Sequence, residues 1–140
     1  MPKVTVTTAK GLVQETGSAP TNLSPGLAMG VQTLAAAGSN SQANSTPIVA
    51  TDGSLVMVTG AGSNKGVRLP ALSSVPAGTM FYILNDGAAT LEVFPASGDQ
   101  IHPTGSDNDG ITIAAGGMLI CISDAAGTLW ASAEPAATGA

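Results

Sequence analysis

The fold is decided by residues 80–95, which read MFYILNDGAATLEVFP. Two short apolar runs, 80–84 and 91–94, flank Asn85-Asp86-Gly87, which is a turn signal. In the second run Leu91 and Val93 alternate with Glu92, as in a strand with one face buried. The first run is apolar at every position, as in a strand covered on both sides. This stretch therefore predicts two β-strands.

The same pattern extends over most of the chain from residue 47 onward. Turn-forming sequences rich in Gly, Asp and Asn separate the runs, and none of the runs is long enough for an ordinary helix. The further apolar runs are 48–49, 55–58, 67–69, 111–113, 118–122 and 129–130. A spacing of roughly 10 to 12 residues between runs is typical of antiparallel β-sandwiches and barrels.

We therefore expect an all-β fold, an antiparallel β-sandwich or barrel. The chain has no strict internal repeat, which predicts against a solenoid or a propeller. Pro70 and Pro95 are expected to end their strands, because proline cannot donate to a β-ladder.

The first 44 residues differ from the rest. Val4 and Val6 alternate with threonines and predict a short strand, whereas residues 15–26 contain two prolines and many turn formers. A strand is expected around Val31–Leu34, although a helix over 27–37 also fits the spacing. We predict an extended N-terminal arm at 1–44, which needs a partner to become ordered, a β-domain at 45–134 and a flexible tail at 135–140.

Composition and charge exclude several functions. Charged residues make up 9% of the 140 residues, against about 25% in an average soluble domain, and the net charge is −5. The four bases are too few for nucleic-acid binding, which requires Lys and Arg against the phosphates. We expect no membrane partner either, because no apolar stretch reaches 18 residues. So few charges favour a protein whose surface is covered by neighbours in an assembly.

No group of residues predicts catalysis, a metal or a cofactor. Cys121 is the single cysteine and lies in an apolar run, which predicts a buried side chain. His102 is the single histidine, so a His-rich metal site cannot form. The acidic loop ending at Gly110 lacks the spacing of a calcium-binding loop, and the glycine-rich loop 60–66 lacks the Gly-Lys-Ser/Thr of a phosphate loop. We expect a protein that is not an enzyme.

The order of several weak motifs resembles small β-structured virion proteins of tailed bacteriophages, namely capsid decoration or cement proteins and domains of tail fibres. The resemblance covers roughly 100 residues and rests on the order of these motifs rather than on any one of them. The motifs are Val31 to Gly38, Val67-Arg68-Leu69-Pro70, Gly78 to Asn85, Leu91 to Pro95, Gly98 to Ile101, Ala114 to Gly117 and Gly127 to Trp130.

The resemblance implies an antiparallel, jelly-roll-like sandwich. It also implies a subunit that is made in the host cytoplasm and binds the outer capsid surface of the virion. Its partners would be the major capsid protein and copies of itself, as a trimer. We expect the contacts to involve Val4 and Val6 in the arm and Met80 and Tyr82 in the two-sided strand, although Met80 and Tyr82 also fit a plain core. The alternative is a tail-fibre or receptor-binding domain that recognises host glycan, for which the chain has few aromatic residues to stack on sugars.

Overall fold

The structure, a computed structural model, describes residues 4–7, 11–14, 30–38, 41–104, 106 and 109–133. Its twelve strands are β1 (Val4–Thr7), β2 (Gly11–Gln14), β3 (Val31–Ala35), β4 (Thr46–Pro47), β5 (Leu55–Thr59), β6 (Gly66–Arg68), β7 (Met80–Asn85), β8 (Leu91–Phe94), β9 (Gln100–Ile101), β10 (Ile111–Ile113), β11 (Met118–Ser123) and β12 (Leu129–Ala133). Two single-turn 3₁₀ helices, η1 (Gln42–Asn44) and η2 (Leu72–Ser74), lie between strands. The prediction of an all-β protein is confirmed.

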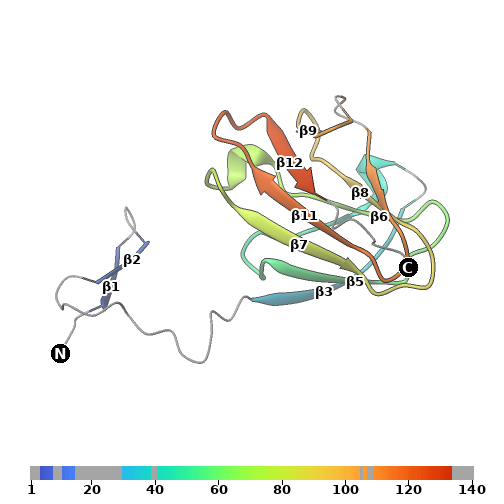
Figure 1. Ribbon diagram of the computed structural model, residues 1–140, viewed down its shortest axis with the longest axis horizontal. Coiled ribbons are helices and arrows are strands. Elements are labelled where there is room, and N and C mark those ends of the chain that lie inside the picture. Colours follow the sequence, from blue (N-terminus) through green and yellow to red (C-terminus); the bar gives the residue numbers. More distant parts are fainter. Residues whose placement is uncertain are drawn as a thin grey trace, which may run out of the picture.

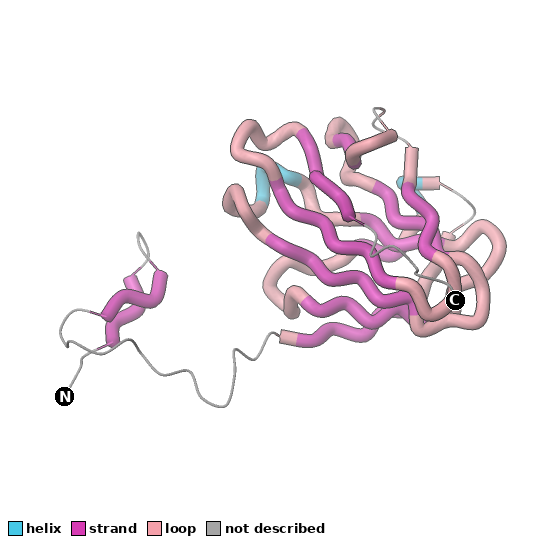
Figure 2. Tube along the Cα trace, in the orientation of Figure 1, coloured by secondary structure: helices cyan, strands magenta, loops and turns pink. Residues whose placement is uncertain are grey.

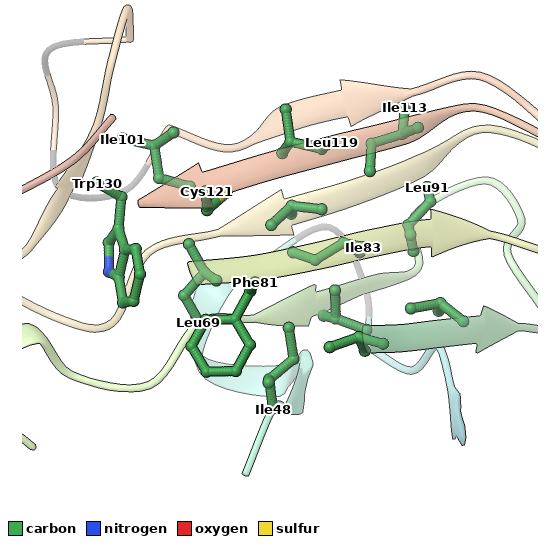
Figure 3. Packing of buried hydrophobic residues seen from close by; sticks show 14 of the residues in the cluster. Ile48, Leu69, Phe81, Ile83, Leu91, Ile101, Ile113, Leu119, Cys121 and Trp130 are labelled. Atoms are coloured by element: carbon green, nitrogen blue, oxygen red, sulfur yellow. The ribbon is translucent and has the colours of Figure 1, made fainter. Parts of the chain in front are cut away.

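Two sheets form the body of the protein (Figure 1). The larger has six strands in the order β3-β5-β7-β11-β12-β9, and the smaller has four in the order β10-β8-β6-β4. The antiparallel hairpin β1–β2 forms a third, two-stranded sheet. The two larger sheets face one another and enclose one hydrophobic core, as the tube view and the close-up show (Figures 2 and 3).

From β3 to β8 the chain alternates between the two sheets and winds as a β-solenoid. Strands β3, β5 and β7 are parallel to one another in the large sheet, and β4, β6 and β8 are parallel in the small sheet. Val31 pairs with Leu55 and Leu55 with Tyr82, so one coil adds 24 residues and the next adds 27. Antiparallel strands close the last coil, because β11 pairs with β7 and β10 pairs with β8.

This winding corrects two predictions. The expected antiparallel, jelly-roll-like sandwich is wrong, because the sheets are mixed and the first three coils pair in parallel. The prediction against a solenoid is also wrong. Parallel and antiparallel strands bury their side chains with the same alternation, so the run pattern does not distinguish them. Coils of unequal length, in turn, hide the period that a search for repeats requires.

The body begins earlier than the predicted boundary at residue 45. Strand β3 pairs along its length with β5, Gln32 and Ala36 are buried, and Gln42 in η1 is also buried. Residues 31–38 and 41–44 thus belong to the solenoid rather than to an arm. The strand expected around Val31–Leu34 is confirmed as β3. The predicted tail, 135–140, lies outside the described residues.

The core is built from the inward side chains of both sheets (Figure 3). Phe81 and Trp130 lie at one end with ring centroids 5.8 Å apart and planes tilted by 58°, a favourable aromatic arrangement. The fully buried members also include Val56, Val58, Val67, Leu69, Ile83, Leu91, Val93, Ile101, Ile113, Leu119 and Cys121. Side chains from strands far apart in sequence therefore stabilise one another across the two sheets.

A buried amide joins the sheets at the other end. The Asn85 side chain is completely buried, and its Nδ2 donates to the carbonyl oxygens of Ala89 at 2.8 Å, Ile113 at 3.1 Å and Ala114 at 3.0 Å. Its Oδ1 accepts from the backbone N–H of Gly87 at 3.0 Å. One side chain thus ties the end of β7 to the turn before β8 and to the end of β10.

Candidate interaction surface

The large sheet has an outward side that is apolar, and we call this surface the outer face. It consists of the side chains of Val31, Leu55, Met57, Met80, Tyr82, Leu84, Met118, Ile120 and Ile122, whose positions alternate with buried residues along β3, β5, β7 and β11. Val31 is 54% exposed and Ile122 is 37% exposed, and the others are partly exposed. Both sides of these strands therefore carry large apolar side chains.

Strand pairing places these side chains in continuous rows. Leu55 stands beside Tyr82 and Tyr82 beside Ile120, and Val31 extends this row to the sheet edge. A second row runs from Met57 through Leu84 to Met118, and Met80 pairs with Ile122 in a third. Neighbours on one face of a sheet are within contact distance of each other. The outer face is thus one contiguous patch rather than scattered apolar residues.

The outer face carries no carboxylate, ammonium or guanidinium group, and the side chains beside it in β3, β5 and β12 are Ala, Thr and Leu. The described acidic residues instead lie in loops and turns or, for Glu92, on the small sheet. The outer face is therefore a contiguous apolar patch without charge, on a protein with a net charge of −5, and it is the candidate interaction surface.

The outward side of the small sheet is different. Arg68 and Glu92 lie there, and burial raises the pKa of the Glu92 carboxyl. Helix η1 covers part of this side, because Gln42 donates from Nε2 to the Pro95 carbonyl at 2.8 Å and accepts from Arg68 at its own carbonyl at 3.1 Å. Hydrogen bonds within the chain thus hold η1 against the outward side of the small sheet, whereas no described element covers the outer face.

The structure separates the four predicted contact residues. Met80 and Tyr82 lie on the outer face, not in the core, and they are partly exposed. Val4 and Val6 lie in β1, where their backbones pair with Gln14 and Leu12, and their side chains are outside the described part of the structure. Sequence reasoning missed Leu55, Met57 and Ile120, although the continuous apolar runs that contain them were the available signal.

The reactive side chains do not form a chemical site in the described residues. Burial raises the pKa of the Cys121 thiol to about 12, so the thiol stays protonated and unreactive. His102 is exposed at the end of β9, and its carbonyl accepts from the Ser132 hydroxyl. No three His, Cys, Asp or Glu side chains gather as metal ligands in the part of the chain that is described.

The acid at the β11–β12 turn has a structural role. Partial desolvation raises the pKa of the Asp124 carboxyl, but backbone hydrogen bonds outweigh this effect and hold the pKa below its usual value. The bonds from Gly127, Thr128 and Leu129 are 2.8, 3.0 and 3.2 Å long. Asp124 thus fixes the turn that leads from β11 into β12.

Of the aromatic residues, only Tyr82 is on the surface. Phe81, Phe94 and Trp130 are 1%, 3% and 0% exposed. A surface that stacks on sugar rings or bases needs exposed aromatic faces, usually more than one.

Comparison with protein-family models, with curated proteins and with solved structures gave no match. Among the described residues, no helix has the length and apolar character needed to cross a membrane.

Proposed function

We propose that this chain is a bacteriophage virion protein that decorates the outer surface of the capsid and cements its subunits. The observation that carries the proposal is the outer face, an uncharged apolar patch across four strands of the large sheet. The low charge content of the whole chain and the order of its sequence motifs agree with a subunit of a large assembly. In this proposal Met80 and Tyr82 contact the major capsid protein.

The size of the outer face suggests how tightly such a subunit would bind to the capsid. Four strands at about 4.8 Å spacing, each with about five residues at 3.3 Å, cover on the order of 300 Å². A stable interface uses about 800 Å² on each partner. One copy therefore binds weakly by this face alone, and several linked copies bind much more tightly through multivalency. The homo-oligomer that the resemblance implies would supply such linkage, and shell stability then increases by mass action.

The alternative, a tail-fibre or receptor-binding domain for glycan, has less support. Tyr82 is the single surface aromatic among the described residues, and its neighbours on the sheet are aliphatic or Met side chains. Sugar-binding surfaces combine aromatic stacking with polar groups that bond to hydroxyls, and the outer face offers Tyr82 as its one polar side chain.

Co-sedimentation tests the proposal directly. Capsids of the phage that encodes this chain, prepared without it, are mixed with purified protein and pelleted. We expect wild-type protein to pellet with the capsids, and Tyr82→Lys or Ile122→Lys to lower the affinity at least tenfold, because each buries a charge in the contact. Absence of wild-type binding, or wild-type affinity in both variants, would refute the proposal.

A matched control is Thr112→Lys, which adds the same charge at an exposed position of β10 in the other sheet. This control should bind like wild type. The emission of Trp130, which is fully buried, verifies that each variant is folded before its binding is compared.

A further inference from the structure

The two ends of the solenoid are not equivalent. At the C-terminal end β11 and β12 continue the large sheet beyond β7, and β10 continues the small sheet beyond β8. At the N-terminal end β3 is the last strand of the large sheet, and no described strand pairs with its free edge. Solenoids usually cover both terminal coils, because an open strand edge is a template for further pairing.

The free edge of β3 presents specific backbone groups. The carbonyls of Gly30 and Leu34 and the N–H of Ala36 point toward β5, so the backbone groups of Val31, Thr33 and Ala35 point the opposite way. The Ala35 carbonyl already accepts from the Thr46 hydroxyl at 2.7 Å. The edge therefore offers both groups of Val31, both groups of Thr33 and the N–H of Ala35.

This edge lacks the usual protection against pairing. Exposed edge strands normally carry Lys, Pro, a bulge or a very short length. Strand β3 has five residues, Val-Gln-Thr-Leu-Ala, without a charge or a proline, and its register with β5 is unbroken. The other terminal strands are shorter, since β4 and β9 have two residues each and β10 has three, and β4 contains Pro47.

We propose that β3 pairs antiparallel with β3 of a second copy of this chain, centred on Thr33. In this register Thr33 faces Thr33 of the other copy, and each Ala35 N–H donates to a Val31 carbonyl. The buried side chain of Gln32 and the partly buried side chain of Leu34 stay on the core side of both copies, and the exposed side chains of Val31, Thr33 and Ala35 stay on the outer side. The large sheet then continues across both copies.

Self-pairing is favoured over another partner because the strand is its own complement in this register. Reversal about Thr33 places the exposed positions 31 and 35 opposite one another, and it places the buried Gln32 opposite the partly buried Leu34. No ionisable side chain lies in β3 or β5, so the net charge of −5 on each copy does not place like charges at the joint. Asp52 lies in the loop between Val49 and Gly53 that bonds to Gln32. The antiparallel arrangement therefore puts the two Asp52 residues at opposite ends of the joint.

The inference does not depend on a capsid, and it fits the proposed function. Joining two large sheets at β3 brings two outer faces side by side and doubles the apolar area available to a common target. Such pairing is isologous, so each β3 contact produces a dimer. If the trimer implied by the resemblance also forms, with its three-fold axis meeting this two-fold axis at a right angle, the two contacts together give six copies.

Charge exchange at Thr33 tests this geometry with the purified full-length chain. Light scattering after size exclusion should give a dimer or a hexamer for wild type, with a concentration-dependent dissociation. Thr33→Lys alone and Thr33→Glu alone should each weaken pairing about tenfold or more, because like charges then stand directly opposite. Mixing the two variants should restore pairing to within a few-fold of wild type, which occurs only if position 33 faces itself.

Thr112→Lys and Thr112→Glu, on the exposed side of β10, are the matched controls and should leave the mass unchanged. A second readout uses Thr33→Cys, since residues in a hydrogen-bonded antiparallel pair have Cα atoms about 5.5 Å apart, which suits a disulfide. Mild oxidation should link two copies, whereas Thr112→Cys should not. A wild-type monomer or trimer, or no rescue on mixing, would overturn the proposal; failure of capsid binding would not affect it.

Discussion

Replacing the buried amide of Asn85 should destabilise the fold in a pH-dependent way. Asn85→Asp keeps the size of the side chain but replaces the Nδ2 donor by an oxygen. Three carbonyl oxygens, those of Ala89, Ile113 and Ala114, lie 2.8 to 3.1 Å from that position. An ionised carboxylate would face all three acceptors in a fully buried site, and a protonated one could donate to only one of them.

The magnitude follows from the bonds that are lost. Each lost buried hydrogen bond costs about 1 kcal/mol, so Asn85→Asp in its protonated form loses two bonds and about 2 kcal/mol. Burial and the carbonyl oxygens disfavour the ionised form, so the pKa of the introduced carboxyl is raised in the folded state. The penalty is then smallest below the unfolded pKa of about 4, and it grows by about 1.4 kcal/mol per pH unit until the folded pKa is reached.

The assay is urea unfolding followed by the fluorescence of Trp130, the single tryptophan. We expect Asn85→Asp to lose about 2 kcal/mol at pH 4 and at least about 4 kcal/mol at pH 7 relative to wild type. Asn85→Ala, which cannot ionise and removes all four side-chain hydrogen bonds, should show a loss of about 4 kcal/mol that does not change with pH. A loss below about 1 kcal/mol for Asn85→Asp at pH 7, or the same loss at both pH values, would refute the role given to this amide.

Three further predictions concern the body of the protein. Gly53→Ala should lower the free energy of unfolding by at least about 2 kcal/mol, because φ is +139° and a Cβ would lie 2.3 Å from the Gly30 carbonyl carbon. The control is Gly60→Ala, at φ +66° with open space around it, which should cost about 1 kcal/mol in the same urea assay. The Cys121 thiol should not react with a maleimide at pH 8 until the protein unfolds, since its pKa is raised to about 12, and rapid labelling of native protein would contradict its burial. Asp124, whose pKa is lowered in the folded state, should stabilise the protein above its unfolded pKa and lose that effect as the pH falls. The melting temperature of Asp124→Asn should therefore fall less than that of wild type between about pH 5 and 2. The same fall of melting temperature in both proteins would contradict this role.

Positions of strands could be predicted from the sequence because they depend on local patterns. The runs at 55–58, 67–69, 80–84, 91–94, 111–113, 118–122 and 129–130 all lie in or overlap strands. The run at 48–49 does not, since the neighbouring strand β4 is Thr46–Pro47, and β9 was missed because two residues carry no pattern. The parallel order could not be predicted, because it depends on how the coils stack and leaves no trace in single-strand alternation.

The candidate surface could be predicted in part. A run such as Met80–Leu84, apolar at each position, signals a strand with both sides covered. Within the described ranges, other residues cover only the inner side of this strand. The position of the second sheet is needed to decide whether Met80 and Tyr82 are core residues or surface residues. The role of Asn85 could not be predicted from the sequence, because a turn explains Asn-Asp-Gly. Its side-chain amide also bonds to carbonyl oxygens of residues 28 and 29 positions away along the chain.

The central claim is that this chain coats a phage capsid, and immunogold labelling of intact virions tests it most directly. Antibody raised against the purified protein is applied to virions of the phage that encodes the chain. We expect gold particles distributed over the whole shell. Label confined to one vertex or to the fibres, or no label on the particles, would contradict the claim.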